Sequence, residues 1–423
     1  MINRIHRPVS RNKLFAVFEV MKKGELIKWK DDLERELKEN ILPFWMKYSP
    51  DHINGGFVGH ISYLNQVNEK ADKGAVMHAR ILWTFAAVYR MFGDDAYLKI
   101  AGRAKDYIRD FFMDKEFGGV YWSLNYRGEP AVMRKQIYAS AFVIYAFAEY
   151  FQAGGDKEAL DSAIRLFREV EDHAFDSERN GYTEALSREW NPVGDVRLSD
   201  KDANERKTMN THLHILEAYT NLFRVWKDTR LKQALENIIT LFIEQFIDPG
   251  TWHLNLFFDD HWNNKTTFVS FGHDIECSWL LHEAAEVLGK KELADRTAEI
   301  AVKMARKNMM GLDSDNGLSY EFFPLENRLD SDRHWWVQAE ALVGYFNAYQ
   351  LSGDGEFLKK ARGIWNFIRE YLIDRNHGEW FWSVNREGIP NTLNEKAGFW
   401  KCPYHNSRAC MEMIRRIEGY HRN

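Results

Sequence analysis

Apolar residues recur at helical spacing along most of the chain, in pairs of segments that a short polar turn joins. Residues 78–92 and 97–112 form one such pair, and residues 136–153 and 158–175 form another. In most of the turns glycine ends one helix and a charged residue opens the next: FGDDA, GGDKE, KDTRL, LGKKE and SGDGE. This pattern predicts five helical hairpins.

Glycine-rich aromatic segments separate the hairpins. They occupy residues 54–62, 117–130, 180–192, 251–262, 316–328 and 377–390, and the second and sixth share Trp-Ser-x-Asn-x-x-Gly-x-Pro. Their glycines recur every 61 to 68 residues, with one interval doubled: Gly56, Gly119, Gly181, Gly317 and Gly378. Such a period indicates a repeat architecture, and the alternation of apolar and polar residues after each glycine turn predicts short strands or β-hairpins.

A sixth helical pair forms if the first helical segment, 25–47, packs beside the last one, 406–421. Twelve helices in six pairs predict an all-α fold, an (α/α)6 barrel of six helical hairpins with short β-hairpins at the active-site end. One helix of each pair would line the inside. The sequence contains no glycine-rich phosphate loop, dinucleotide fingerprint or proline-rich linker. We therefore expect residues 25–423 to form a single catalytic domain.

The composition is that of a globular protein with a large core, since 45% of the 423 residues are apolar and 28% are charged. A net charge of −5 and a pI near 6.3 provide no electrostatic footprint for nucleic acid or an anionic membrane, so we expect neither as a partner. Three cysteines are too few for a disulfide framework and indicate a reducing cytoplasm. We also expect a monomer.

Residues 1–24 differ from the rest of the chain. They are basic, and their apolar run, LFAVF, is only five residues long before Glu19 interrupts it. This is too short for a signal peptide or a membrane span. Two alternatives remain for this segment: a disordered N-terminal extension, or sequence upstream of a start at Met21.

Unusual polar and aromatic residues stand just before or at the start of the inner helix in all six repeats. They are His78, Arg80, Gln136, Tyr138, Asn210, His212, His214, His273, Glu276, His334, Trp335, Trp336, Trp400 and His405. A single histidine or tryptophan is more often a core residue. Because the same position in every repeat lies at the same end of a barrel, we expect the six segments to meet in one pocket.

Two pairs of these residues share a helix face: Asn210 with His214, and His273 with Glu276. A carboxylate fixes the tautomer of a neighbouring imidazole or raises its pKa, whereas a helix N-terminus disfavours the imidazolium. Under both influences the pKa of a histidine stays near neutral pH, where a general base works best. Glu276 has two other interpretations, a glycosidase acid and a surface charge, and its position at the mouth makes the surface charge the weakest.

A metal site is an alternative for some of these residues. Cys402 and His405 lie three positions apart, but a proline intervenes and the chain has no second Cys-x-x-Cys or Cys-x-x-His. His212 and His214 are two positions apart and would point to different faces of a helix. We therefore expect no metal, and we interpret Cys402 and Cys410 as buried, unreactive thiols.

Aromatic residues are abundant, with 15 Trp, 18 Tyr and 28 Phe. Aromatic faces suit the C–H faces of sugar rings, but an aromatic-rich helical core is an equally good interpretation of the numbers alone.

Five stretches are together similar to one family: RILWTFAA, MNTHLHILEAYTNL, GHDIECSWLL, RHWWVQAEALVGY and FWKCPYHNSRACME. They resemble the cellobiose 2-epimerases, a branch of the N-acylglucosamine 2-epimerase superfamily, in order from about Leu26 to the end of the chain. The related N-acetylglucosamine epimerases and mannose isomerases share the barrel and two late histidines. DIECSWLL and WKCPYHNSR resemble the disaccharide branch.

The resemblance implies reversible C2 epimerisation of the reducing glucose of a β-1,4-linked disaccharide, without a cofactor or metal. It implies that His273 and His405 remove and return the C2 proton through an enediol intermediate, and that one of them assists ring opening. Arg80 and Tyr138 would hold the O1 or O2 oxygens where negative charge develops. The implied sugar contacts are completed by Asn210, His214, Glu276, Trp335, Trp336 and Trp400.

Physical reasoning agrees with this implication on one point. Inversion of a carbon next to a carbonyl needs proton exchange on both faces, and therefore either two bases or one base and a rotating intermediate; two histidines from opposite repeats suit it. The insertion at 187–207 is expected to cover the second sugar. Within it, Asp202 is either a sugar contact or part of a solvated acidic loop.

Three other functions remain open at this point. A monosaccharide or N-acylglucosamine 2-epimerase or isomerase of the same superfamily would act on free glucose, mannose or N-acetylglucosamine. An inverting glycoside hydrolase on the same barrel would need two opposed carboxylates, for which Glu276 and Asp202 are the candidates. A non-catalytic carbohydrate-binding protein would need only aromatic platforms.

Overall fold

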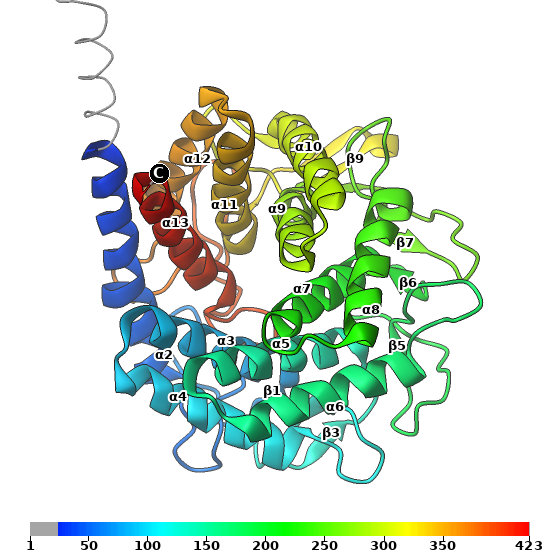
Figure 1. Ribbon diagram of the computed structural model, residues 1–423. Coiled ribbons are helices and arrows are strands. Elements are labelled where there is room, and N and C mark those ends of the chain that lie inside the picture. Colours follow the sequence, from blue (N-terminus) through cyan, green and yellow to red (C-terminus); the bar gives the residue numbers. More distant parts are fainter. Residues whose placement is uncertain (1–23, 423) are drawn as a thin grey trace, which may run out of the picture.

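Six helices form a closed inner ring in the computed structural model, which describes residues 24–422 of the chain (Figure 1). Each inner helix packs against the next one, and the last packs against the first. The inner helices are α3 (Ala75–Phe92), α5 (Ile137–Gly154), α7 (Met209–Val225), α9 (Phe271–Leu288), α11 (Trp335–Ser352) and α13 (Tyr404–Arg422). The ring is the inner wall of an (α/α)6 barrel, so the predicted fold is confirmed.

A second layer of helices covers the outside of the ring. It contains α4 (Asp95–Tyr107), α6 (Lys157–His173), α8 (Thr229–Leu241), α10 (Lys291–Asn308) and α12 (Gly355–Phe367). The sixth outer position is taken by a helical stretch over 24–48, which runs on through η1 (Glu36–Ile41) and α2 (Leu42–Tyr48). Because η1 contacts α13, the predicted pairing of the first and last helical segments is confirmed.

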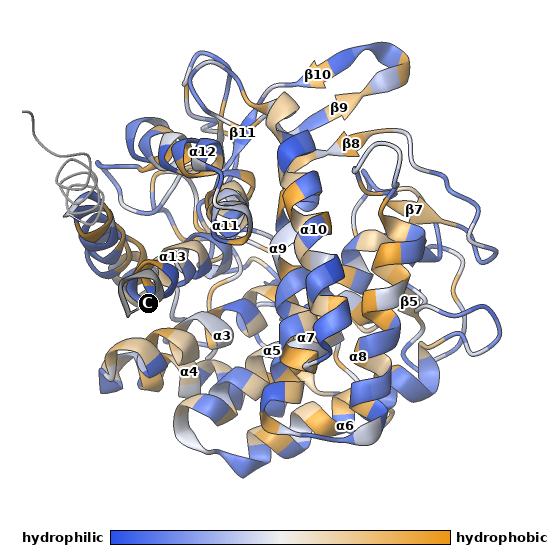
Figure 2. Ribbon diagram, turned by 45° about the horizontal axis from the view of Figure 1, so that its top comes forward, coloured by the Kyte–Doolittle hydropathy of each residue, from blue (hydrophilic) through white to orange (hydrophobic). Residues whose placement is uncertain are grey.

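Inner and outer helices are buried differently. Every residue of α5 from Ile137 to Glu149 is buried, since this helix is surrounded by its neighbours in the ring and by the outer layer. In α6 the buried residues recur at helical spacing, from Ala159 to Val170, so that only one face packs on the ring. The outer helices accordingly carry both apolar and polar residues along their length (Figure 2).

The turns between inner and outer helices form as their sequences predict. Four inner helices end at a glycine in the left-handed conformation: Gly93, Gly155, Gly289 and Gly353. Four outer helices begin at an aspartate whose side chain accepts a backbone N–H bond: Asp94, Asp156, Asp228 and Asp354. Both are the favoured caps for these positions.

α4, α8, α10 and α12 end in wider or tighter turns that lead the chain to the next β-hairpin. π-helical turns follow α4, α8 and α12, namely η2 (Ile108–Phe112), η3 (Phe242–Phe246) and η6 (Ile368–Leu372). A 3-10 turn, η4 (Met309–Gly311), follows α10, and another, η5 (Pro324–Glu326), lies in the fifth hairpin.

Short antiparallel strands join neighbouring repeats at the end of the barrel where the inner helices begin. The pairs are β1 (Lys73–Gly74) with β2 (Ser123–Leu124), β4 (Lys135–Gln136) with β5 (Ala185–Leu186), β6 (Lys207–Thr208) with β7 (Phe257–Phe258), β8 (Val269–Ser270) with β9 (Glu321–Phe323) and β11 (Arg333–His334) with β12 (Ser383–Val384). β3 (Pro130–Val132) and β10 (Arg328–Asp330) extend two of them. A bridge between Ile61 and Ala397 joins the sixth repeat to the first.

A buried cation paired with an aspartate recurs beside these strands. A lysine before the inner helix binds an aspartate of the preceding hairpin in four repeats: Lys73 with Asp51, Lys135 with Asp114, Lys207 with Asp176 and Lys396 with Asp374. Arg333 and Asp313 do the same in the fifth repeat. Because a buried charge is costly unless it is paired, each pair fixes a hairpin to the helix that follows it.

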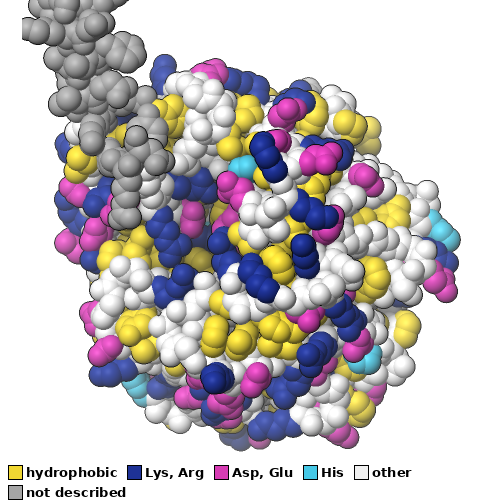
Figure 3. All heavy atoms as spheres, in the orientation of Figure 1, with side chains coloured by type: hydrophobic (Ala, Val, Ile, Leu, Met, Phe, Trp, Pro, Cys, Tyr) yellow, Lys and Arg dark blue, Asp and Glu magenta, His cyan; other side chains and the backbone are white. Residues whose placement is uncertain are grey.

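Residues 1–24, the predicted extension, fall outside the described part of the chain except for Gly24, which is helical. No helix among the described residues is long and apolar enough to cross a membrane. On the face drawn in Figure 3, acidic and basic side chains are intermixed, in keeping with the small net charge.

Candidate active site

Most of the predicted site residues lie in the first two turns of the inner helices, at the hairpin end of the barrel; Trp400 and Asp202 lie in the segments that precede α13 and α7. The second residue of four inner helices is one of them: Tyr138, Asn210, Trp336 and His405. His273 is the third residue of α9, and Arg80 is the sixth residue of α3, about one turn deeper. The spacing of these residues in the sequence therefore predicted the correct end of the barrel, but the residues do not occupy the same position in each inner helix.

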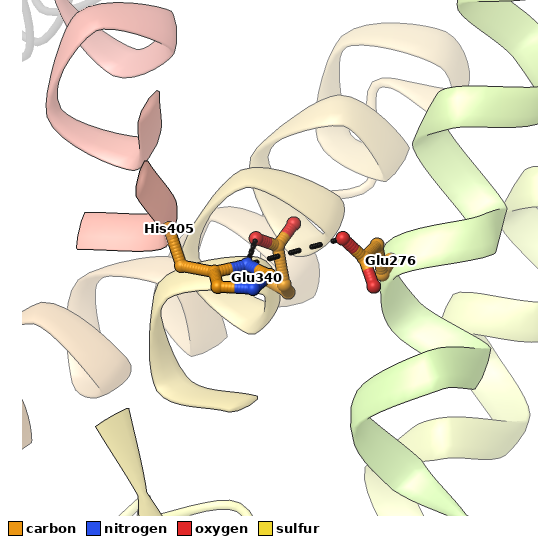
Figure 4. A group of neighbouring side chains, drawn as sticks. All are labelled: Glu276, Glu340 and His405. Carbon is orange, nitrogen blue, oxygen red and sulfur yellow. Dashed lines mark hydrogen bonds and ion pairs between the residues drawn. The ribbon is translucent and has the colours of Figure 1, made fainter. Parts of the chain in front are cut away.

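His405 is held by a carboxylate from the neighbouring inner helix. Its Nδ1 lies 2.7 Å from Oε1 of Glu340 and 3.9 Å from Oε1 of Glu276. Figure 4 shows the three side chains, which come from α13, α11 and α9. Beside a carboxylate Nδ1 carries the proton, which leaves Nε2 as the acceptor on the opposite edge of the ring. His405 is thus arranged to act as a base through Nε2.

Arg408, one turn along α13, connects three buried glutamates. Its Nη2 donates to Oε1 of Glu340 and to Oε1 of Glu276, both at 2.7 Å, and its Nη1 donates to Glu217. The guanidinium is 2% exposed, and Glu217 is 4% exposed. Breaking a buried, hydrogen-bonded charge network is costly, so the network fixes Glu340 and, through it, His405.

The same atoms resemble a small metal site. Ligand atoms of Glu276, Glu340 and His405 lie within 4.8 Å of one another. However, Nη2 of Arg408 is 2.7 Å from both carboxylates, so a positive charge already stands beside them. The donor set therefore fits the resident guanidinium better than a metal ion. Cys402 is not part of this cluster, since its Sγ lies 3.9 Å from Nη1 of Arg80.

Glu276 is buried rather than exposed at the mouth. It is 1% exposed, so the interpretation of Glu276 as a surface charge is wrong. Burial and the neighbouring Glu340 charge raise the pKa of Glu276 to about 7, against the lowering effect of Arg408. Burial also raises the pKa of Glu340. The protonated form of Glu276 is therefore favoured more than in water, and Arg408 offsets part of this effect.

His273 and His405 are neighbours of one indole. The ring centroid of Trp336 lies 4.9 Å from that of His273 and 5.7 Å from that of His405. Nδ1 of His273 lies 2.8 Å from Oγ of Ser270, so Nε2 is the ring nitrogen that would reach a ligand. Two imidazoles from α9 and α13 are thus brought beside the same aromatic surface.

Gly272 makes room for this indole. A Cβ at Gly272 would lie 2.5 Å from the ring of Trp336. Gly272 is the second residue of α9, where four other inner helices carry a predicted site residue. In the fourth repeat, the indole of Trp336 from the fifth repeat therefore occupies the space that a side chain at Gly272 would take.

Both histidines are kept neutral at neutral pH. Burial, together with the neighbouring His214, lowers the pKa of His273 to about 3. Burial and the charges of Arg80 and Arg408 lower the pKa of His405 well below its usual range. From the sequence we expected pKa values near neutral pH, set by a carboxylate and a helix N-terminus; this is wrong, because burial lowers both pKa values well below neutrality. Both imidazoles are therefore unprotonated in the resting site and able to accept a proton.

Arg80 is a buried cation beside the histidines. Its Nη2 donates to the hydroxyl of Tyr138 at 2.8 Å, and its Nη1 donates to the carbonyl of Trp400 at 3.3 Å. Its guanidinium carbon lies 4.2 Å from the ring centroid of Phe142. Arg80 is 3% exposed, and within residues 24–419 it forms no ion pair with a carboxylate. A buried cation without a counter-charge is suited to an anionic ligand or intermediate.

α7 contributes two further polar groups. Nδ1 of His214 lies 3.1 Å from Oε2 of Glu217, and its ring centroid is 4.8 Å from that of Tyr138. Oδ1 of Asn210 is buried and has no hydrogen-bond partner among the described residues. Because an unpaired buried amide oxygen is costly, it is available for a ligand hydroxyl.

Two of the predicted sugar contacts, Trp335 and Asp202, instead contact other residues of the protein. Trp335 is 3% exposed, packs on Trp382 with 4.7 Å between ring centroids, and lies 5.1 Å from the ammonium of Lys401. Oδ2 of Asp202 accepts bonds from the backbone N and Oγ of Ser199, both at 2.9 Å, and the side chain is half-buried. Trp335 thus packs the inner helix, and Asp202 braces its own loop rather than being solvated.

His78 and His212 brace the hairpins. Nε2 of His78 accepts the backbone N–H of Phe57 at 3.2 Å, and Nε2 of His212 accepts that of Tyr182 at 2.9 Å. Burial lowers their pKa values to about 3 and about 4. As predicted, His212 and His214 serve different surroundings.

Three residues of the site were missed in the sequence: Glu217, Glu340 and Arg408. Each lies one turn beyond a predicted residue on the same helix, since they follow His214, Trp336 and His405 by three or four positions. This i+3 and i+4 spacing was the signal that would have identified them.

A cavity of about 550 Å³ lies among later turns of α7, α9, α11 and α13. Arg224 and Glu283 pair there at 2.5 Å, and Arg416 and Glu412 pair at 3.3 Å. These charges neutralise one another, whereas Arg80 in the first turns has no carboxylate partner. The candidate site is therefore the one formed by the first turns.

Comparison with known proteins decides the family. The model of the N-acylglucosamine 2-epimerase (GlcNAc 2-epimerase) family matches residues 55–409. The chain belongs to this family. It is 54% identical over 385 residues to a cellobiose 2-epimerase of Bacteroides fragilis, covering 91% of this chain and 98% of that protein. A cellobiose 2-epimerase of Ruminococcus albus is 41% identical over 386 residues, with the same coverage.

A solved structure agrees with these relatives. The cellobiose 2-epimerase from Bacillus thermoamylovorans B4167 superposes with a TM-score of 0.87 at 41% identity and covers 92% of this chain and 99% of that chain. The resemblance stated from the five sequence stretches is confirmed. As a member of the N-acylglucosamine 2-epimerase family, the protein is an isomerase, and the residues above are its candidate machinery.

Proposed function

We propose that the protein catalyses the reversible C2 epimerisation of the reducing-end glucose of β-1,4-linked disaccharides. Cellobiose would give glucosyl-mannose, and lactose would give epilactose. The observation that carries the proposal is the placement of two neutral imidazoles, His273 and His405, against the indole of Trp336. The relatives named cellobiose 2-epimerase align with nearly the whole chain and support the same substrate class.

The chemistry assigned to the histidines is proton exchange at C2. After the sugar ring opens, Nε2 of one histidine takes the C2 proton, and the electron pair of that C–H bond forms the C1–C2 double bond of an enediolate. A proton returned to the opposite face of C2 gives the epimer. His273 and His405 provide either two bases or one base and a rotating intermediate, and one of them also assists ring opening.

Arg80 would stabilise the negative charge that develops on O1 or O2. Its guanidinium is buried and has its own neutral partner, the hydroxyl of Tyr138 at 2.8 Å. A fixed cation in a dry site stabilises an oxyanion more strongly than one in water. Glu340 would stabilise the imidazolium that forms on His405, since its Oε1 is 2.7 Å from Nδ1.

The remaining predicted residues divide into contacts and supports. Asn210 and His214 would bind hydroxyls of the open sugar, and Trp336 and Trp400 would pack against it. In this proposal, the three other predicted sugar contacts act through their neighbours: Glu276 through Arg408, Trp335 through the packing of α11, and Asp202 through the loop at 187–207.

A glycoside hydrolase receives less support from the same geometry. Glu276 is hydrogen-bonded to Arg408, and Asp202 braces its own loop, so the two candidate carboxylates do not stand free across a common space. A monosaccharide or N-acylglucosamine epimerase would differ in accepting free glucose, mannose or N-acetylglucosamine. In a carbohydrate-binding protein, His273 and His405 would be dispensable.

The proposal includes a monomeric cytoplasmic enzyme that needs no metal or cofactor, with residues 25–423 as one catalytic domain. All six inner helices of one chain surround the candidate site, which supports a site complete in the monomer. Arg408 supplies the positive charge beside the two carboxylates. The buried thiols of Cys277, Cys402 and Cys410 suit a reducing compartment.

Incubation with cellobiose or lactose in D2O, with a chelator and no added metal, tests the proposal. We expect the 2-epimer to form and deuterium to appear at C2 of the reducing sugar. Parallel incubations with glucose, mannose and N-acetylglucosamine separate the monosaccharide alternative. Release of free glucose from cellobiose without any epimer would instead indicate hydrolysis and overturn the proposal.

A further inference from the structure

Glu379 adopts a backbone conformation for which three other repeats use glycine. In those repeats the backbone N–H of an aspartate donates to the carbonyl of a left-handed glycine: Gly56 (φ 60°), Gly119 (φ 69°) and Gly181 (φ 87°). In the sixth repeat, Asp374 donates the same bond to Glu379 at 2.9 Å, and φ of Glu379 is 64°. Left-handed backbone is disfavoured for a residue with a side chain, so the surroundings must hold it.

The contacts of the Glu379 carboxylate stabilise this backbone conformation. The residue is 0% exposed, and its Oε1 accepts bonds from Nζ of Lys401 at 2.9 Å and from Nδ2 of Asn406 at 2.7 Å. Its Oε2 accepts a bond from the indole N–H of Trp45 at 2.7 Å. Lys401 is also 0% exposed. This is a buried, hydrogen-bonded ion pair rather than a surface contact.

The partners of Glu379 flank the candidate site. Lys401 follows Trp400 directly, and the carbonyl of Trp400 accepts a bond from Nη1 of Arg80 at 3.3 Å. Asn406 follows His405 directly. One carboxylate therefore holds both the segment that carries Trp400 and the first turn of the helix that carries His405.

In the sixth repeat a longer segment of chain separates the paired lysine from the inner helix. In the first three repeats the inner helix begins two residues after the paired lysine, whereas α13 begins eight residues after Lys396. The intervening segment contains Trp400 and is joined to the first repeat by the Ile61–Ala397 bridge at its start. The Lys396–Asp374 pair already fixes the hairpin of the sixth repeat, as the equivalent pairs do elsewhere. The Glu379–Lys401 pair is therefore an additional contact in this repeat.

We propose that Glu379 is a positioning residue for the epimerase site, acting through Lys401 and Asn406 on Trp400 and His405. The inference rests on the proposed function for the chemistry it affects. The unfavourable backbone of Glu379 is retained because glycine, which the other repeats use there, has no carboxylate to place between these two segments.

Two variants test the proposal. Glu379→Gln keeps the shape of the side chain and removes its charge. The double variant Glu379→Gly, Lys401→Met removes both buried charges and restores the residue that suits the backbone. For both we expect kcat for lactose epimerisation to fall about 10- to 100-fold, because small displacements of a base are costly in rate. The Gln variant is expected to unfold at a lower temperature, and the double variant within a few degrees of the wild type.

A second measurement separates this inference from the proposed reaction. The probe is the open-chain alditol made by reducing cellobiose, and calorimetry gives its Kd without turnover. We expect the Kd to rise several-fold in both variants as Trp400 shifts. The matched control is Asp51→Asn with Lys73→Met, another buried pair, from the first repeat, which should keep kcat and Kd per folded protein.

Each outcome is informative. Wild-type kcat, KM and Kd in a folded double variant would overturn the positioning role. Failure of both variants to fold, with the control folded, would also overturn it, since the pair would then serve folding. If the wild type forms no epimer but the variants still lose alditol binding relative to the control, the proposed reaction fails and the positioning role stands.

Discussion

Nδ1 of His405 lies 2.7 Å from Oε1 of Glu340, and that oxygen also accepts a bond from Arg408 at 2.7 Å. His405 and Glu340 come from α13 and α11 and stand 65 positions apart in the chain. A carboxylate placed this way selects the tautomer with Nε2 unprotonated and stabilises the imidazolium that forms when Nε2 takes a proton. The activity of His405 should therefore depend on a residue that does not touch the sugar.

Replacing Glu340 by Gln should lower kcat about 10- to 100-fold with a smaller change in KM, since partners of this kind are typically worth that much. The amide can donate to Nδ1 and favour the tautomer with Nε2 protonated, which is the wrong one for a base. Initial rates of epilactose formation from lactose give both constants.

The control for Glu340→Gln is Glu283→Gln, which removes a carboxylate among the later turns of α9, where Glu283 pairs with Arg224 at 2.5 Å. Thermal unfolding of both variants separates loss of structure from loss of rate. A folded Glu340→Gln protein with kcat within twofold of the wild type would contradict the role assigned to the carboxylate.

Replacing His273 or His405 by Asn should abolish epimerisation while the protein stays folded. Loss of a general acid or base typically costs about 10² to 10⁴-fold in rate. Asn is smaller than His and uncharged, so it should fit a site that already surrounds a neutral imidazole, and the protein should fold. Deuterium incorporation at C2 from D2O measures each histidine separately: a variant that exchanges the proton without forming the epimer retains the base of one face. Full activity in either variant would refute the role of that histidine.

Trp335 and Trp336 should behave differently although they are adjacent. Trp335 packs on Trp382 away from solvent, so Trp335→Ala should lower the free energy of unfolding by about 3–5 kcal/mol, the usual cost of removing a buried aromatic side chain. Trp336 is half-buried beside His273 and His405, so Trp336→Ala should mainly raise KM. Urea unfolding and steady-state kinetics on both variants test the contrast, and equal KM values would contradict it.

The fold was predictable because its signals are local and repeated. The turn FGDDA contains both the left-handed Gly93 that ends α3 and the capping Asp94 that starts α4, and similar signals recur in the other repeats. Ring closure was predictable once six pairs were counted, since repeats of this kind bury their faces only against neighbours. The Lys–Asp pairs beside the strands were not recognised, because a lysine and an aspartate 22 residues apart, such as Lys73 and Asp51, look like ordinary surface charges in a sequence.

The site was only partly predictable, because the direction of a side chain depends on helix phase. Trp335 and Trp336 are neighbours in the sequence but turn about 100° apart on a helix, so Trp335 packs on Trp382 whereas Trp336 packs on His273. Asp202 lies in an insertion that has no counterpart in the other repeats to set its place. The network from Glu217 to Arg408 joins α7 to α13 across 191 positions. Of its members only Glu276 was predicted, whereas Glu217, Glu340 and Arg408 each lie one turn beyond a predicted residue.

His212 makes the free energy of unfolding depend on pH in the acid range. Burial lowers its pKa to about 4, whereas an unfolded chain has a histidine pKa of about 6.5. Above pH 6.5 neither state is protonated at this residue. As the pH falls from about 6.5 to 4, the unfolded chain takes up a proton that the folded protein does not, so the free energy of unfolding decreases. A shift of this size corresponds to about 3 kcal/mol at pH 4.

His212→Gln should remove this dependence without removing the hydrogen bond that His212 makes. The same chain provides the precedent: Gln338 is the fourth residue of α11 as His212 is of α7, and its Oε1 accepts the backbone N–H of Leu318 at 2.8 Å. Urea unfolding at pH 7 and pH 4.5 should show the variant losing about 2 to 3 kcal/mol less than the wild type over this interval. His261→Gln, at an exposed position, is the control and should follow the wild type. If His212→Gln loses as much stability as the control, then His212 is not the buried neutral base that its contacts with Tyr182 and the start of α7 indicate.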